Sequence, residues 1–413
     1  MARVLVTYGW CRTSYVIVRS LAKRGHDVYA CSSLRPAMAS WSRFTRGGAV
    51  VRDPFEEPEA FVTDVAALVG RWGIEAIFPG HEDAIPLRQY AGLLPDDVAL
   101  VCPPLDDLVR GVDKASTARV AVSAGVHVPD TLFPEHPQDA VAAAELLGFP
   151  VVVKLRHSNG GKGVVVAEDA AAVRAAFDGP FRGLGDRPGH VALVQRFATG
   201  SVVGACLIAR DGEPIAMYGE RYLRTKDDGF GTSTYRCPEP SPALLEATAR
   251  MVRALRWSGI GHFDFLEEAG TGRLLFLEMN PRPWGAIHLA YVNGFDFPAA
   301  ALALALGATD LEGFFPRGRD HGLRHSVWLV GEGIRLVHRL MLRGRAWQVH
   351  TPAGGRPHLQ WWRARLDGFE WHDPLAFAAE CTCYLSEFVR TRGHVNPHTD
   401  GMHAPIDLAE RPR

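Results

Sequence analysis

Two stretches near the middle of the chain, GIGHFDFLEE and RLLFLEMNPRPWG, are typical of consecutive strands joined by a turn at residues 268–272. A connection so short and rich in glycine favours an antiparallel hairpin, in which side chains alternate between two faces. His262 and Asp264 then share a face, as do Phe276, Glu278 and Asn280. The expected register places His262 or Asp264 opposite Glu278, so the sequence predicts a sheet with acidic and amide side chains gathered on one face.

These polar side chains have the composition of a cation site. Carboxylates roughly 5 to 8 Å apart across a hairpin repel each other unless a cation lies between them. Asp264, Glu278 and Asn280 offer oxygen ligands, which suit Mg²⁺ completed by water and phosphate. Arg282 follows closely, and its planar fork could bind a phosphate. The alternative is a purely structural strand end followed by an Asn-Pro turn.

Length and charge narrow the class of protein. A chain of 413 residues is expected to form two or three domains. Its formal net charge of −1 argues against nucleic acid or an anionic membrane as a partner. The first residues lack the layout of a signal peptide, and the longest apolar run, at residues 298–307, is too short to cross a bilayer. Seven dispersed cysteines form no disulfide framework, so we expect a cytoplasmic location.

Lysine is rare in this chain. Lysine and arginine total 45, yet only residues 23, 114, 154, 162 and 226 are lysines. Surface charge is therefore supplied by arginine, and a lysine is expected where a compact, flexible ammonium is needed. Lys114, Lys154 and Lys162 all fall in or beside one segment, which points to an anion site there.

Residues 1–110 alternate short apolar runs with helical patterns, which predicts an open parallel sheet covered by helices. The Gly-x-Gly-x-x-Gly pattern of dinucleotide sites does not follow the first strand, where residues 9–12 read GWCR. Ligands of such sheets bind beyond the carboxyl ends of the strands, so Glu82 and Asp83 are candidate pocket residues. Alternatively, they are acids that stabilise the start of a helix.

The segment FPVVVKLRHSNGGKGVVVAE predicts a strand ending at Lys154, a glycine-rich turn and a returning strand. Glycine N–H groups in such a turn can approach phosphates closely, and Lys162 adds charge. A glycine-rich hairpin can equally be only a turn. The two lysines favour anion binding, although the chain has no Walker motif.

Taken together, these motifs resemble those of the ATP-grasp superfamily, and in particular its predicted carboxylate-amine ligases. The resemblance covers residues 3–305 and is most specific at GHFDF with FLEMNPR, then at FPVVVKL with SNGGKGV. It implies an α/β protein with the ATP-grasp fold. The N-terminal open parallel-sheet (pre-ATP-grasp) domain would span residues 1–110. The ATP-grasp domain would span residues 111–305, in subdomains 111–195 and 196–305, before a C-terminal accessory region at 306–413 with a loosely ordered tail.

The resemblance also implies roles for single residues. Two Mg²⁺ ions would be held by Asp264, Glu278 and Asn280. Mn²⁺ could replace Mg²⁺ at this site. Many relatives carry a ribose-binding glutamate after the glycine of the adenine-contacting segment, whereas Gly200 is followed here by Ser201. The implied contacts to ATP are Lys114, Lys154, Gly160, Gly161, Lys162, Gly163, Gln195, Arg196, Phe197 and Ala198.

The implied reaction begins when a small-molecule carboxylate attacks the γ-phosphate of ATP, and an amine then displaces phosphate from the acyl phosphate. Arg282 or Arg221 could stabilise the oxyanion of the second step. Five of the ten tryptophans lie after residue 306, where they pack an accessory core or form a wall of the substrate pocket. A homodimer is expected from the family. The candidate substrate contacts are Glu82, Arg224, Ser233 and Trp284.

Two other functions fit the same residues. One is an ATP-grasp enzyme that activates bicarbonate and makes a carboxylated or carbamoylated product. The other is a nucleotide-binding module without catalysis, which the altered ribose position favours. The complete set of two carboxylates, Asn280 and Arg282 favours an enzyme, because a pure binder has less need of all four.

Overall fold

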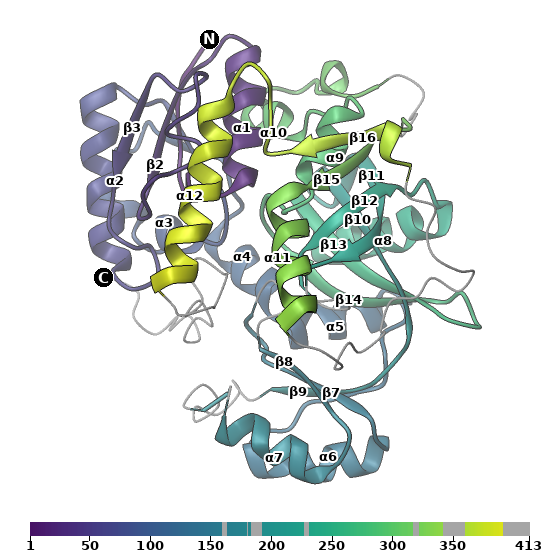
Figure 1. Cartoon of the computed structure of the whole chain (residues 1–413). Helices are drawn as coiled ribbons and strands as arrows, with labels where there is room; N and C mark the ends of the chain where they lie inside the picture. Colours follow the sequence, from purple (N-terminus) through teal and green to yellow (C-terminus); the bar gives the residue numbers. More distant parts are fainter. Residues whose placement is uncertain are drawn as a thin grey trace.

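The computed structural model of the chain describes residues 1–158, 163–179, 181–182, 192–226, 231–316, 322–341 and 360–390. Gly160, Gly161 and Lys162, the predicted phosphate-covering residues, and the predicted tail after residue 390 lie outside the described residues. Within these ranges three sheets organise the molecule, each with its own covering helices (Figure 1).

The N-terminal sheet is parallel throughout, in the order β3-β2-β1-β4-β5. Helices connect most of the strands, whereas β2 leads to β3 without one. Helix α2 begins with a proline and ends at Gly73, whose φ of 60° permits the left-handed turn. Strand β1 lies between β2 and β4, where the strand order reverses and such sheets bind ligands. The elements are β1 (Arg3–Val6), α1 (Arg12–Lys23), β2 (Asp27–Ser32), β3 (Gly47–Val50), α2 (Pro58–Trp72), β4 (Ala76–Phe78), α3 (Ala84–Gln89), η1 (Ala91–Leu93), β5 (Ala99–Leu100) and α4 (Leu105–Val112).

A small antiparallel sheet in the order β6-β9-β7-β8 forms the part of the molecule that lies lowest in Figure 1, with α6 and α7 packed against it. Val151, Val153 and Val194 alternate into the core beneath these helices. Strand β7 ends at Lys154, as the sequence predicts. The elements are α5 (Lys114–Ser123), which belongs to the next layer, β6 (Thr131–Leu132), α6 (Pro137–Leu147), β7 (Val151–Lys154), β8 (Val164–Ala167), α7 (Ala170–Asp178) and β9 (Leu193–Arg196).

The largest sheet has the order β14-β13-β10-β11-β12-β15-β16 and is antiparallel except for its last pair. Helices α5 and α8 cover one face, and α9 and α10 cover the other. Helix α1 packs on α9 and α10, so the N-terminal domain and this sheet share one hydrophobic core. The elements are β10 (Gly200–Arg210), β11 (Glu213–Thr225), β12 (Ser233–Pro238), α8 (Pro242–Leu255), β13 (Gly259–Glu268), β14 (Leu274–Asn280), α9 (Ile287–Val292), α10 (Phe297–Ala305), η2 (Glu312–Phe314) and β15 (His325–Trp328).

The predicted hairpin is confirmed as β13 and β14, with Asp264 directly opposite Glu278 and His262 opposite Asn280. The predicted parity is wrong at one position, because the register shifts between Asp264 and Phe265. Phe276 therefore turns into the core under α8, and Glu278 faces the opposite side of the sheet. A β-bulge of this kind re-aims one side chain beside a binding site.

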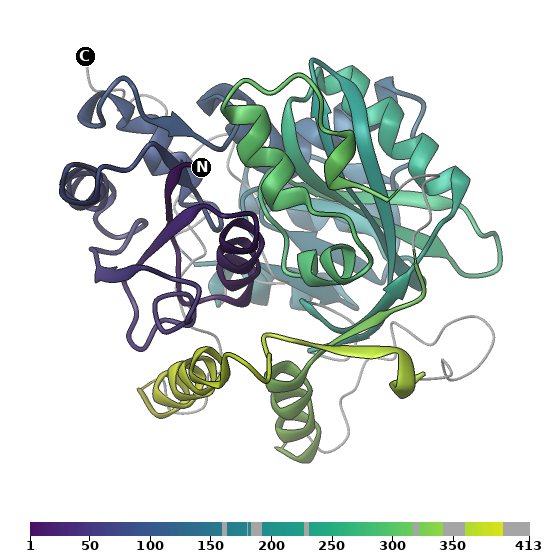
Figure 2. The same ribbon diagram turned by 90° about the horizontal axis from the view of Figure 1, so that it is seen from above.

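Residues after β15 extend the large sheet and then return to the N-terminal domain. Strand β16 pairs in parallel with β15, and α12 lies beside the N-terminal sheet, as both views show (Figures 1 and 2). Asp373 fixes the start of α12 by accepting hydrogen bonds from Ser42 Oγ at 2.5 Å and the Arg43 backbone N–H at 2.9 Å. None of the described helices combines the length and apolar character that a membrane span requires. The elements are α11 (Leu329–Met341), η4 (Trp361–Arg363), β16 (Ala364–Asp367) and α12 (Pro374–Arg390).

Candidate active site

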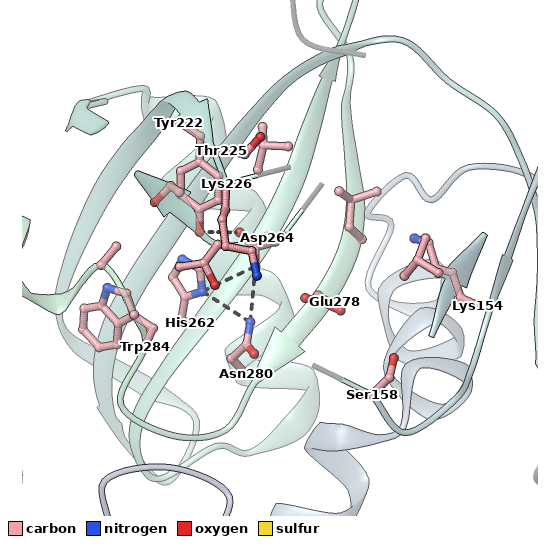
Figure 3. A pocket seen from close by; sticks show the side chains of 18 of the residues that line it. Lys154, Ser158, Tyr222, Thr225, Lys226, His262, Asp264, Glu278, Asn280 and Trp284 are labelled. Atoms are coloured by element: carbon pink, nitrogen blue, oxygen red, sulfur yellow. Dashed lines mark hydrogen bonds and ion pairs between the residues drawn. The ribbon is translucent and has the colours of Figure 1, made fainter. Parts of the chain in front are cut away.

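One pocket receives side chains from all three sheets and from α12. The small sheet contributes Lys154 and Gln195, the large sheet contributes Asp264 and Glu278, and Tyr8 comes from the end of β1. Figure 3 shows Glu278 between Asp264 and Lys154, with Trp284 beside His262 at the far side. The pocket is therefore a meeting point of segments that are far apart in the sequence.

Asp264 and Glu278 face each other across the hairpin, as a shared cation would require. Asp264 Oδ1 accepts a hydrogen bond from Tyr222 Oη at 3.0 Å, and Oδ2 accepts one from Asn280 Nδ2 at 3.2 Å. Burial raises the pKa of Asp264 to about 6, and the nearby Glu278 adds to the rise. A bound cation would remove this penalty, so the carboxylate pair and its amide neighbour fit Mg²⁺.

His262 lies behind Asp264 in a buried chain of charges. Its Nδ1 is 3.6 Å from Asp264 Oδ2, and its Nε2 is 3.1 Å from Glu220 Oε1. Burial alone would lower the pKa of His262, but the two carboxylates outweigh burial and raise it. The ring stacks on Trp284 with centroids 5.8 Å apart and planes 9° from parallel. His262 thus helps to fix the position of Asp264 from the side away from the pocket. The sequence analysis did not predict Glu220, the other partner of His262.

The lysines lie on the other side of Glu278. Lys114 Nζ is 3.2 Å from Glu278 Oε2 and donates a hydrogen bond of 2.5 Å to the carbonyl of Ser158. Burial lowers the pKa of Lys154 to about 8, although the charge of Glu278 opposes the shift. Two ammonium groups beside a cation-binding pair of carboxylates form a place where phosphate oxygens can be held.

The predicted adenine-contacting segment also lines this pocket, at Gln195, Arg196, Phe197 and Ala198. Gln195 Nε2 donates to Thr131 Oγ1 at 2.8 Å, which fixes the amide orientation. Arg196 is paired with Asp130 and Glu268 at the rim. These residues are joined by Val152, Val202 and Leu266, so this end of the pocket has apolar walls and few polar groups.

Arg282 projects into the pocket while its guanidinium is held from two sides. Nη2 donates to Asn280 Oδ1 at 2.9 Å, and Nε donates to Glu82 Oε1 at 3.3 Å. Glu82, predicted as a substrate contact, does not line the pocket and instead pairs with Arg282. Asp83 stands at the N-cap of α3, but its fully buried side chain accepts hydrogen bonds from the Thr7 hydroxyl and the His81 N–H and caps no N–H group of the helix. Asp83 is not among the residues that line the pocket.

Two family models match parts of the chain. The model described as ATP-grasp in the biosynthetic pathway with Ter operon matches residues 215–320. The model of the carbamoyl-phosphate synthase L chain ATP-binding domain matches residues 113–184. A biotin carboxylase domain of the 2-oxoglutarate carboxylase of Hydrogenobacter thermophilus superposes with a TM-score of 0.63 at 16% identity, covering 76% of this chain and 71% of that chain. Both family models support the ATP-grasp superfamily, and the superposition shows that the chain has the ATP-grasp fold.

The curated relatives of this ATP-grasp protein are much longer. It is 24% identical over 310 residues to acetyl-CoA carboxylase 2 of Oryza sativa subsp. japonica. This alignment covers 64% of this chain and 13% of the carboxylase. It is 25% identical over 255 residues to the arginine-specific carbamoyl phosphate synthase large chain of Geobacillus stearothermophilus, covering 59% of this chain and 24% of that protein. The chain thus spans less than a quarter of either relative. The resemblance and the fold predicted from sequence are confirmed.

Two predicted roles need correction in the ATP-grasp structure. Arg221 lies on the other face of β11, between Glu239 at 2.6 Å and Glu267 at 2.7 Å, and is not among the pocket residues. Strand parity explains the error, because the neighbouring Tyr222 is the residue of this pair that faces the pocket. Arg224 is likewise outside the pocket and donates to Glu332 of α11 at 2.8 Å. Neither residue is placed to stabilise an oxyanion or bind a substrate.

The other candidate substrate contacts, Ser233 and Trp284, do line the pocket. Gly163 lies at the start of β8 with φ at 67°, so glycine suits its backbone. Sequence reasoning missed two pocket cations, Lys226 and Arg12. The rarity of lysine could have revealed Lys226, whereas no signal distinguished Arg12 in a chain so rich in arginine.

Proposed function

We propose that this protein is an ATP-dependent carbon–nitrogen ligase that activates a carboxylate as an acyl phosphate, joins it to an amine and releases ADP and phosphate. The observation that supports the proposal is the pairing of Asp264 with Glu278 in one continuous pocket with Lys154 and Arg282. Lys114 lies outside the pocket lining and pairs with Glu278. ATP bound with Mg²⁺ would supply the transferable phosphoryl group and neutralise its charge. A related structure supports these cofactors, because the 2-oxoglutarate carboxylase domain was solved in complex with MgADP, ADP and bicarbonate.

The residues of the chain have positioning and electrostatic roles in this reaction. Phosphoryl transfer requires aligned groups and charge neutralisation, and no protein nucleophile. Asp264, Glu278 and Asn280 would hold the cation, while Lys114 and Lys154 would bind phosphate oxygens. Lys154, with its lowered pKa, gains charge stabilisation when an anion arrives.

Arg282 has the geometry for the second step. Its guanidinium is buried, with 8% of its surface exposed, and Asn280 and Glu82 fix its orientation. A held cation of this kind can bind the acyl phosphate and then stabilise the oxyanion that forms when the amine attacks. Removing one such donor typically lowers the rate by about 10² to 10³.

The second candidate function is activation of bicarbonate in place of an organic carboxylate. The curated relatives with carboxylase and carbamoyl phosphate synthase names favour it. A homodimer is a further part of the proposal, since the 2-oxoglutarate carboxylase domain is described as a dimer. Gel filtration with light scattering tests the dimer independently of activity.

The direct test is ADP release by the purified protein with Mg²⁺ and ATP, against pooled carboxylic acids with and without pooled amines or bicarbonate. Release that requires an acid and rises with an amine supports the ligase, and release that requires bicarbonate supports the second candidate. Glu278→Gln should reduce either activity by at least about a hundredfold. Glu267→Gln is the matched control, because Glu267 lies on the neighbouring strand and pairs with Arg221 outside the pocket.

Near-normal turnover by Glu278→Gln would refute the cation assignment. If no pool supports release while ATP still raises the melting temperature, the substrate lies outside the pools or the protein is a nucleotide-binding module without catalysis.

A further inference from the structure

The pocket continues past Trp284 into a second compartment beside the N-terminus of α1, where Cys11, Arg12 and Thr13 line it. Figure 3 shows Trp284 on the side of His262 away from Glu278, and the carbonyl of the next residue, Gly285, accepts a hydrogen bond from Arg12. A group bound at Arg12 is therefore set apart from the carboxylates that would hold ATP. We call this end of the pocket the aromatic compartment.

Arg12 is held so that one edge of its guanidinium remains available. Nε donates to the Gly285 carbonyl at 3.1 Å and to Asp367 Oδ2 at 3.0 Å, and the group lies 3.9 Å from the centre of the Trp328 ring. In the part of the chain that the structure describes, neither Nη atom has a hydrogen-bond partner. Arg12 is only 7% exposed and lines the pocket, so this pair of donors can only be reached from within it.

The local charge balance favours an anion. Arg12 and Arg236 both bind the buried carboxylate of Asp367, which leaves one positive charge in excess among these three groups. Glu380, another buried acid near Arg12, offsets this charge only in part, because burial favours its protonated form. The first turn of α1 contains no acidic residue, and its N-cap, Cys11, makes no side-chain capping bond. The unpaired N–H groups of a helix start add a partial positive charge at the same place. A planar fork beside a helix start suits a carboxylate.

The walls of the compartment are aromatic. Tyr8 contacts Trp10 with ring centroids 5.2 Å apart, and Tyr384 of α12 lies between Trp10 at 6.2 Å and Trp328 at 5.7 Å. Tyr8 has φ at 56°, a conformation that a bulky residue rarely adopts and that is found at functional sites. Each of these rings lines the pocket, and together they would contact the faces of an apolar or aromatic group.

We propose that the aromatic compartment binds a carboxylate that is not activated, carried on an aromatic or apolar body, with the carboxylate on the Nη atoms of Arg12. The inference rests on the proposed function only in taking this ligand to be part of a substrate. The carboxylate could belong to the amine substrate, as in an amino acid, or be the second carboxylate of the acyl donor. In both cases it anchors the substrate and does not react.

Calorimetric titration of the full chain with three probes tests the inference without any turnover. L-phenylalanine and 3-phenylpropanoate should bind, and phenethylamine, which lacks the carboxylate, should bind at least tenfold more weakly. Arg12→Gln should lower the affinity for 3-phenylpropanoate by at least tenfold. Arg19→Gln is the matched control, since Arg19 is buried on the same helix and pairs with Glu370 outside the pocket. It should leave the affinity unchanged.

Equal binding of phenethylamine and 3-phenylpropanoate, or equal affinities of Arg12→Gln and the wild type, would overturn the inference. If Arg12→Gln does not fold, Tyr384→Leu replaces it, because this change removes one aromatic wall and should weaken 3-phenylpropanoate several-fold. Unaltered affinity in that variant would overturn the inference as well.

Turnover then identifies which substrate carries the carboxylate. ADP release supported by phenylalanine and not by phenethylamine assigns it to the amine substrate. Release supported by phenylsuccinate and not by 3-phenylpropanoate assigns it to the acyl donor. Glu278→Gln should still bind 3-phenylpropanoate, so failure of the ligase proposal and failure of this inference give different results.

Discussion

At the scale of single residues, Lys154 offers a direct test of the nucleotide site. Burial lowers its pKa to about 8, so the amine is largely neutral and nucleophilic between pH 8 and its ordinary value of about 10.4. At pH 9 the neutral fraction is roughly twentyfold that of an ordinary lysine. Limited acetylation at pH 9 should therefore modify Lys154 several-fold faster than Lys23, and ATP with Mg²⁺ should protect it. Peptide mass spectrometry measures both rates, and equal rates without protection would contradict the assignment.

The residues that sequence analysis identified are those whose type is unusual in this chain or fixed by strand parity. Lys114 and Lys154 are two of only five lysines, and Asp264 and Glu278 follow from the hairpin. Arg12 could not be found this way. Its role depends on Asp367, which is 355 positions away and pairs with it only in the folded chain.

At the scale of elements, the docking of α12 on β15 depends on a buried acid. Trp328 Nε1 donates to Glu380 Oε1 at 2.9 Å, while Oε2 has no hydrogen-bond partner among the described residues. Burial raises the pKa of Glu380 to about 7, against the pull of Arg12. Between about pH 4.3 and 7 the folded state binds a proton that the unfolded state releases, so stability falls as pH rises through this window.

Glu380→Gln should therefore increase the free energy of unfolding at pH 8 by on the order of 2 kcal/mol, and so raise the melting temperature. At pH 4.5 the melting temperature should change little. Glutamine keeps the acceptor for Trp328 and cannot ionise. Glu387→Gln on the same helix is the control, because Glu387 is paired with Arg390. Thermal unfolding at both pH values measures the effect, and an equal gain at pH 4.5 would exclude ionisation as its cause.

Sequence patterns predicted the N-terminal parallel sheet and the hairpin of β13 and β14, but not two details of the large sheet. The bulge in β14 cannot be read from RLLFLEMN, because alternation predicts one face for Phe276 and Glu278, and only packing against α8 decides otherwise. The parallel pairing of β15 with β16 joins two four-residue strands of mixed polarity, and such short strands carry almost no pattern. Long-range pairing, not local propensity, places them.

At the scale of the whole molecule, the carboxylate of Asp367 connects the N-terminal domain, the large sheet and the C-terminal strand β16. Asp367 of β16 binds Arg12 of α1 and Arg236 of β12, and all three side chains are nearly or fully buried. Burial alone would raise the pKa of Asp367, but Arg236 and Arg12 outweigh burial and lower it. Ionised Asp367 thus contributes its full stabilisation above the pKa that it has in the unfolded chain, about 3.9. The stabilisation is lost only as the pH falls through the lower pKa that Asp367 has in the folded protein.

Asp367→Asn should destabilise the protein strongly at pH 7, because it leaves two buried guanidinium groups without their anion. Removing one partner of a buried ion pair typically costs about 3 to 5 kcal/mol. Asp64→Asn removes the partner of Arg52 at the surface, where such pairs contribute about 1 kcal/mol or less, and is the control. Circular dichroism melts compare the two variants. The triad joins the N-terminal domain to the extended sheet. A melt no lower than that of Asp64→Asn would show that the three parts are held together elsewhere.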